Sequence, residues 1–236
     1  MPFPTGSPVY ALMILVGITI GVVFWIKQGR DDPRIPLIYF GGLVGAFAGA
    51  KLAFLLAEGW LYLDDPNRWL LWLSGKSIMG ALPGGWLGVE LTKKALGYTA
   101  ITGDKFALLI PIPLALGRLG CLHAGCCPGL MIRDFRWPAV PVELGFQLVA
   151  LGVLLQLRRF RILPGQHFHL YLMAYGLFRF GHEFLRATPK VLLGLSGYQW
   201  IALATVAAAA VAFARRRCAL MRESPQEMPC EPEAST

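Results

Sequence analysis

Long apolar stretches separated by short polar connections account for most of the chain. Crossing a hydrocarbon core of about 30 Å takes roughly 17–25 residues of helix. The pattern therefore predicts an all-α integral membrane protein with seven transmembrane helices. The third segment is short and rich in glycine, so we expect it to be tilted, broken or partly re-entrant. The segments are residues 9–26, 35–57, 77–91, 106–122, 142–157, 168–185 and 198–214.

The two ends of the chain differ in character. The first apolar segment is followed by Lys27 and Arg30, whereas a cleavable signal carries its positive charge before the apolar run. We therefore interpret it as a first spanning helix, within one transmembrane domain of residues 1–222. Residues 223–236 contain three prolines and four acids, which predicts a disordered cytoplasmic tail.

Composition and charge agree with this class. Hydrophobic residues make up 56% of the chain and charged residues 15%, outside the usual range of soluble proteins. Thirteen Lys and Arg residues fall in the connections on one side of the predicted membrane and six on the other. By the positive-inside rule the N-terminus lies outside and the C-terminus is cytoplasmic. Because the +8 net charge is spread over these connections, no nucleic-acid partner is predicted.

The second apolar segment carries Gly41, Gly45 and Gly49 at four-residue spacing. Such a stripe of small residues lets another helix approach closely. We expect it to be a packing face.

Three cations interrupt the apolar segments: Lys51, Arg118 and Arg179. Ionisable groups in a membrane normally face a cavity or a partner, and Glu183 is the only obvious acid to pair with them. The excess of cations indicates an anionic ligand, most simply a phospholipid phosphate, which suits the bidentate geometry of arginine. The alternative is that Lys51 snorkels to the surface and Arg179 forms a structural pair with Glu183.

The sixth segment places further polar residues beside Arg179. His182, Glu183 and Arg186 follow it at i+3, i+4 and i+7, so all four share one helical face. Glu183 can pair with either arginine on this face.

Three of the five cysteines lie between Gly117 and Gly129, together with His123. The spacing Cys-x-His-x2-Cys-Cys matches no common metal-site pattern, so no metal or other cofactor is predicted, although thiolates suit zinc or copper. Other interpretations are a disulfide from Cys121 to Cys126 or Cys127, a nucleophilic thiol at Cys121 or Cys126, or simple packing in a tight turn.

With these residues in place, the chain resembles the prolipoprotein diacylglyceryl transferase family, bacterial inner-membrane enzymes with seven spanning helices. The resemblance covers nearly the whole chain. Its strongest parts are Gly117-Arg118-Leu119-Gly120 through to Gly129, Tyr175-Gly176-x-Phe178-Arg179-x3-Glu183-Phe184-x-Arg186, and Pro141-Val142-Glu143-Leu144, which is similar to a Pro-x-Gln-Leu-type helix start.

The resemblance implies an activity. Enzymes of this family move the diacylglyceryl group of phosphatidylglycerol to the thiol of a prolipoprotein lipobox cysteine and release glycerol phosphate, with the active site towards the periplasmic or outer leaflet. By position, Arg118 and Arg179 match the family's essential arginines, and these are the expected catalytic residues. Tyr10, Gly129, Glu183 and Arg186 also match family positions. Together with Lys51, Lys76, Cys121 and Cys126, which are taken from this sequence and not from the resemblance, they are the expected substrate-binding residues.

The chain also departs from the family pattern. Cys121 and Ala124 stand where the family usually has asparagine, and Cys126 where it has glutamate. The family's His-Gly-Gly segment is Pro83-Gly84-Gly85 here, so His123 and His182 become the candidate bases. Two alternatives follow: the same lipid donor with a different acceptor or transferred group, or a non-catalytic lipid-, metal- or thiol-redox membrane protein.

Overall fold

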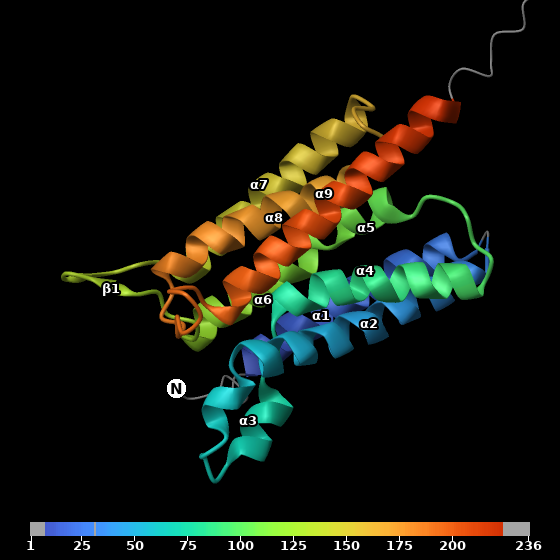
Figure 1. The fold of residues 1–236 in the computed structure, drawn as a ribbon. Helices are drawn as coiled ribbons and strands as arrows, with labels where there is room; N and C mark the ends of the chain where they lie inside the picture. Colours follow the sequence, from blue (N-terminus) through green and yellow to red (C-terminus); the bar gives the residue numbers. More distant parts are fainter. Residues whose placement is uncertain (1–7, 31, 224–236) are drawn as a thin grey trace, which may run out of the picture.

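The computed structural model describes residues 8–30 and 32–223. The chain folds into a bundle of long helices with one small hairpin (Figure 1). The elements are α1 (Pro8–Gln28), α2 (Arg34–Ala57), η1 (Gly59–Tyr62), α3 (Arg68–Ser74), α4 (Ile78–Ala95), α5 (Gly103–Leu109), α6 (Pro111–Ala124), β1 (Met131–Ile132), β2 (Phe135–Arg136), α7 (Ala139–Arg159), α8 (His167–His182), η2 (Glu183–Leu185) and α9 (Gly197–Glu223).

Every predicted apolar segment coincides with helix. The helix break expected in the third segment lies in the fourth segment instead. The third segment forms α4, which is continuous through Pro83. The fourth divides into α5 and α6 at Pro111, whose ring removes a backbone donor from the helical ladder. The last helix extends to Glu223, beyond the expected end at residue 214. The remainder of the predicted tail, residues 224–236, lies outside the described residues.

Five of the described helical segments are long and apolar enough to cross a membrane: α1, α2, α5 with α6, α7 and α9. The other two predicted spans are less apolar or shorter. Helix α4 ends on charged residues, and α8 has 16 residues, about 24 Å at ~1.5 Å per residue. The protein is thus an all-α, multi-pass membrane protein, and seven passes remain a prediction.

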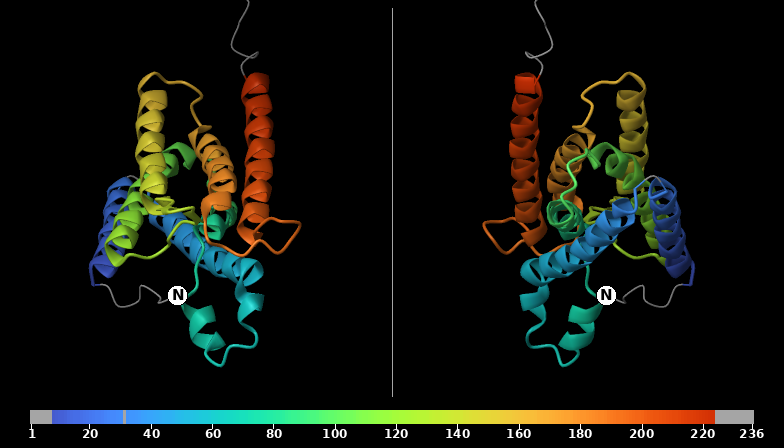
Figure 2. Two further views of the ribbon diagram at one scale, coloured as in Figure 1. Left: turned by 90° about the vertical axis from the view of Figure 1, so that its left-hand side faces the viewer. Right: turned by 90° about the vertical axis from the view of Figure 1, so that its right-hand side faces the viewer.

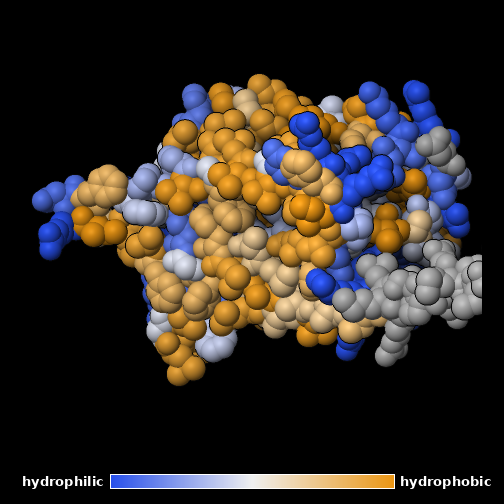
Figure 3. Space-filling view, turned by 90° about the horizontal axis from the view of Figure 1, so that it is seen from above, coloured by the Kyte–Doolittle hydropathy of each residue, from blue (hydrophilic) through white to orange (hydrophobic). Residues whose placement is uncertain are grey.

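The surface and the ends of the chain fit this class. A broad band of apolar side chains covers the face seen in Figure 3, with polar residues gathered towards its two ends. The start of α1 and the end of α9 lie at opposite ends of the bundle (Figure 2), as an odd number of passes requires.

The glycine stripe of α2 is confirmed as a packing face. It lies against a matching stripe of α4, so the two backbones are in direct contact. A Cβ added at Gly45 would overlap the carbonyl oxygen of Gly84, and one at Gly49 would overlap that of Gly80. Glycine is therefore required where these helices touch.

Replacing Gly49 with alanine should destabilise the protein by about 1–3 kcal/mol, because two backbones must move apart to admit one methyl group. Thermal unfolding in detergent micelles, followed by circular dichroism, measures the effect. Gly152→Ala in α7 is the matched control, since a Cβ there meets nothing within 4 Å. Equal unfolding temperatures for the two variants would contradict the packing argument.

Candidate active site

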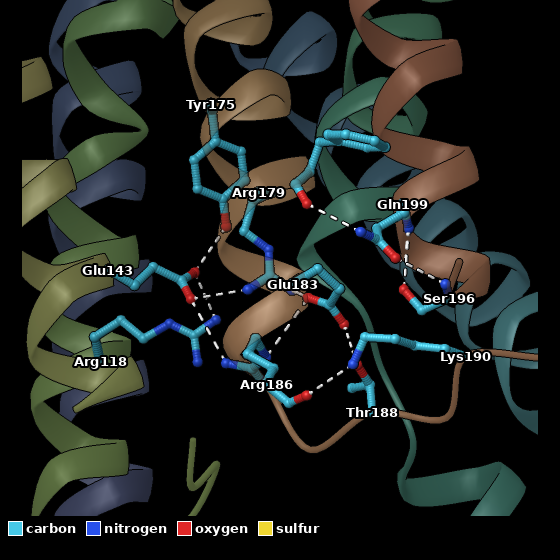
Figure 4. A network of polar contacts seen from close by, with 11 residues as sticks. Arg118, Glu143, Tyr175, Arg179, Glu183, Arg186, Thr188, Lys190, Ser196 and Gln199 are labelled. Carbon is cyan, nitrogen blue, oxygen red and sulfur yellow. Dashed lines mark hydrogen bonds and ion pairs between the residues drawn. The ribbon is translucent and has the colours of Figure 1, made fainter. Parts of the chain in front are cut away.

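A buried carboxylate, Glu143 near the start of α7, lies at the centre of a cluster of arginines (Figure 4). Arg118 of α6 donates to it at 2.7 Å and Arg179 of α8 at 3.2 Å, while Arg186 lies 3.9 Å away. The hydroxyl of Tyr175 donates to the same carboxylate at 2.8 Å. Since only 1% of Glu143 is exposed, these contacts compensate for the loss of its hydration.

A second carboxylate, Glu183, extends the cluster from η2. It accepts a 2.7 Å hydrogen bond from Arg179, four residues earlier, and another from Thr188. Arg186 lies 3.6 Å from the same carboxylate. The guanidinium group of Arg179 therefore bridges Glu143 and Glu183, which fixes its orientation.

The cluster keeps unused positive charge and unused donors. Three guanidinium groups face two carboxylates, a net charge of +1. Within the described part of the chain, the Nε atoms of Arg118, Arg179 and Arg186 and the Nη1 atom of Arg186 make no hydrogen bond. Buried donors without acceptors are costly. An anion with several oxygens, such as a phosphate, would satisfy them.

The cluster opens on a cavity of about 1060 Å³ that reaches far into the bundle. Arg118, Arg179, Glu183 and Arg186 line one part of it, and Lys76 lies on its wall. Most of the remaining wall is apolar, and much of it comes from α1, α2, α4 and α5, although Glu58, Glu90 and Lys93 also line it. Apolar lining residues include Ile14, Leu43, Leu82, Trp86, Phe106 and Leu109.

The turn after α6 brings three thiols to the same cavity wall. Helix α6 ends at Gly125 in the left-handed conformation (φ 63°), and Cys127 has a similar conformation (φ 61°). Cys121, Cys126 and Cys127 are free thiols whose sulfur atoms lie within 4.8 Å of one another. A hydrogen bond from Cys121 and the charges of Arg118 and Arg186 lower the pKa of the Cys127 thiol to about 5.

Gly129 ties this turn to the arginine cluster through the backbone. It forms an antiparallel bridge with Arg186, and the adjacent Leu130 donates to the carbonyl of Leu185 at 2.9 Å. A side chain at Gly129 would overlap the backbone of Trp137. The end of the cysteine turn therefore fixes the backbone that carries Arg186.

Comparison with known proteins gives the family. The sequence model of the prolipoprotein diacylglyceryl transferase family matches residues 5–215. The chain belongs to this family. The relatives it resembles include phosphatidylglycerol–prolipoprotein diacylglyceryl transferases of Clostridium tetani (28% identity over 84% of this chain and 88% of the relative), Vibrio vulnificus (29%; 84% and 84%) and Methylobacillus flagellatus (31%; 80% and 78%). No solved structure matches the chain significantly.

The protein is therefore a membrane transferase of the prolipoprotein diacylglyceryl transferase family, which acts in lipoprotein biosynthesis. Several residues that the sequence predicts for its site do come together. Arg118, Arg179, Glu183 and Arg186 form the cluster, and the cavity wall includes Tyr10, Lys76, Cys121 and Cys126.

Two predicted substrate-binding residues lie elsewhere. The ammonium group of Lys51 donates to the carbonyls of Trp72 and Leu73 at the end of α3, and Lys51 does not line the cavity. Gly129 is also absent from the cavity wall, and its contacts are with the backbone. Both residues support neighbouring segments in this structure.

The candidate bases of this transferase do not reach the cavity wall either. His123 is exposed at the end of α6. His182 is buried, with its ring stacked on Phe178 at 5.0 Å, and neither ring nitrogen has a hydrogen-bond partner among the described residues. Neither side chain can therefore abstract a proton in the cavity without moving.

Sequence reasoning missed the centre of the cluster. Glu183 was expected to be the only obvious acid among the buried cations, but Glu143 is equally buried and contacts all three arginines. Glu143 was assigned only to a helix-start motif, although it lies on the fifth apolar segment. The sequence feature that could have identified Glu143 is an ionisable residue within an apolar segment, the same feature that identified the arginines.

Proposed function

We propose that the protein transfers the diacylglyceryl group of phosphatidylglycerol to a cysteine thiol of a prolipoprotein and releases glycerol phosphate. The observation that carries this proposal is the continuity of the cavity, which joins a cluster of arginines to a long apolar chamber. A phospholipid has the same two parts, an anionic phosphate and apolar acyl chains. The names of the relatives specify the same donor and acceptor for those proteins.

The arginine cluster suits the departing phosphate. The acceptor thiol gives its proton to water, its sulfur attacks the glycerol carbon that carries the phosphate, the carbon–oxygen bond breaks, and the electron pair of that bond leaves on the phosphate oxygen. Arg118, Arg179 and Arg186 stabilise the charge that develops there. Glu143 and Glu183 hold the guanidinium groups in place before the substrate arrives, so little reorganisation is needed.

We further propose that the enzyme lies in the bacterial inner membrane, with this site towards the outer leaflet. The positive-inside rule supports the orientation, since the connections on the opposite side carry most of the Lys and Arg residues. A phospholipid in the outer leaflet and an exported prolipoprotein would then reach the same site.

The function is tested with purified protein in vesicles that contain labelled phosphatidylglycerol, together with a lipobox peptide. The wild type should form a thioether-linked diacylglyceryl peptide and glycerol phosphate. Arg118→Ala should lower the rate by at least 10²-fold, because it removes donors from the leaving phosphate.

Arg136→Ala, an exposed change in the hairpin, is the matched control and should leave the rate unchanged. Mass spectrometry of the peptide and of the lipid fraction identifies the products. If the wild type binds phosphatidylglycerol but modifies no cysteine peptide, the proposed acceptor is wrong.

A further inference from the structure

The three cysteines of the turn after α6 form one cluster of free thiols. Their sulfur atoms all lie within 4.8 Å of one another, although Cys126 and Cys127 are adjacent in the chain. The backbone of Cys127 adopts a left-handed conformation that is unfavourable for a non-glycine residue. All three side chains also line the cavity.

We propose that Cys121, Cys126 and Cys127 bind one zinc ion. Tetrahedral Zn–S bonds of about 2.3 Å place sulfur atoms about 3.8 Å apart, so small side-chain rotations convert the observed spacing into a coordination site. Only three protein ligands are available in this group, because His123 is exposed and lies outside it. Three ligands with an open fourth position are typical of catalytic rather than structural zinc.

The surrounding charge supports this site. A zinc ion held by three thiolates carries a net charge of −1, and the neighbouring cluster of three arginines and two carboxylates carries +1. The two are in contact, since the Nη1 atom of Arg118 lies 4.0 Å from the sulfur of Cys121. The negative charge of the zinc site is thus balanced by the neighbouring cluster, and the guanidinium N–H groups that lack an acceptor among the described residues remain available to the leaving phosphate.

The open position gives zinc a role in the proposed transfer, and this role rests on the proposed function. The acceptor thiol must react as a thiolate, and neither His123 nor His182 lines the cavity. A thiol that coordinates zinc loses its proton to water. Its sulfur then attacks the glycerol carbon, the carbon–oxygen bond breaks, and the glycerol phosphate leaves with the electron pair. The neutral thioether dissociates from the metal, and no group changes oxidation state.

The placement brings the nucleophile close to the groups that bind the leaving phosphate. Cys121 follows Arg118 by one turn of α6, so the zinc-bound nucleophile would lie beside the arginines that receive the leaving phosphate. Gly129 links the same turn to Arg186. Zinc would thus fix the nucleophile and both arginines as one unit.

Metal binding can be measured without any substrate. The purified full-length protein in detergent is stripped with a chelator and titrated with Co²⁺, which reports thiolate ligation by a charge-transfer band, and then with Zn²⁺, which should displace it at one ion per chain. Cys121→Ser and Cys127→Ser should abolish the band. Cys218→Ser is the matched control, because that thiol is exposed on α9 and should not affect binding.

A wild type without a thiolate band, or a band that survives Cys121→Ser, would overturn the site. Phosphatidylglycerol binding by the serine variants checks that they still fold. The transfer assay separates the two proposals. Zinc binding with no lipidated peptide from any acceptor would reject the proposed function and keep the metal site. Full transfer by protein that holds no metal would reject the catalytic role of zinc and keep the function.

Discussion

Arg179→Lys is expected to lower the kcat/KM of diacylglyceryl transfer by about 10²–10³-fold. Arg179 donates to two carboxylates on different elements at once, to Glu143 at 3.2 Å and Glu183 at 2.7 Å, and its Nε–H group has no acceptor among the described residues. Lysine keeps the charge but has no planar fork, so it cannot hold both carboxylates and still donate to a phosphate in a fixed direction.

Initial rates over a range of phosphatidylglycerol concentrations separate binding from turnover. A loss mainly in kcat is expected, because the developing charge on the leaving phosphate is greatest in the transition state. Arg158→Lys, an exposed change in the last turn of α7, is the matched control. If Arg179→Lys and Arg158→Lys show the same rates as the wild type, charge alone is sufficient and the geometric argument fails.

Hydropathy was sufficient to locate the long helices of this protein but not their exact limits, and it did not predict α3. Each apolar segment became helix because a chain in lipid must satisfy its backbone hydrogen bonds internally. The division between α5 and α6 depends on Pro111 within an apolar run, which hydropathy does not register. Helix α9 extends to Glu223 although its arginine-rich end is no longer apolar. The residues at this end have high helix propensity, which hydropathy also does not register.

The site was predictable where the signal is local. Arg118 and Arg179 are conspicuous in the sequence as charges within apolar segments, and Glu183 follows Arg179 by one turn of helix. The role of Glu143 is not local, because it depends on α7 packing between α6 and α8 so that one carboxylate meets arginines 25 and 36 residues away. Lys51 was predicted to bind substrate because, like the arginines, it is a charge within an apolar segment. In the structure it instead donates to backbone carbonyls of α3.

The cysteine turn falls between these cases. The spacing of its cysteines along the chain matches no common metal-site pattern. Spacing alone does not show how the backbone folds and how close the thiols lie in space. Left-handed conformations at Gly125 and Cys127 fold the turn back on α6 and bring together thiols that are five and six residues apart. That path was visible only in the structure.

Glu143→Ala is expected to lower the free energy of unfolding by about 3–5 kcal/mol, because it leaves Arg118 and Arg179 buried with fewer counter-charges. Glu143→Gln should be less damaging. It preserves the volume and an oxygen that accepts from Arg118 and Tyr175, but it removes the charge that all three arginines share. Comparing the two variants therefore separates the contribution of charge from that of packing.

Equilibrium unfolding of both variants in detergent gives the two values, and Glu90→Ala is the matched control. Glu90 also lies within 4 Å of a cation, Lys93, but its side chain is 53% exposed, so its loss should change the stability by no more than about 0.5 kcal/mol. A Glu143→Ala variant as stable as Glu90→Ala would mean that the arginines do not depend on Glu143. In that case another anion, such as a tightly held phospholipid phosphate, would have to balance their charge, and extraction of bound lipid from the variant would identify it.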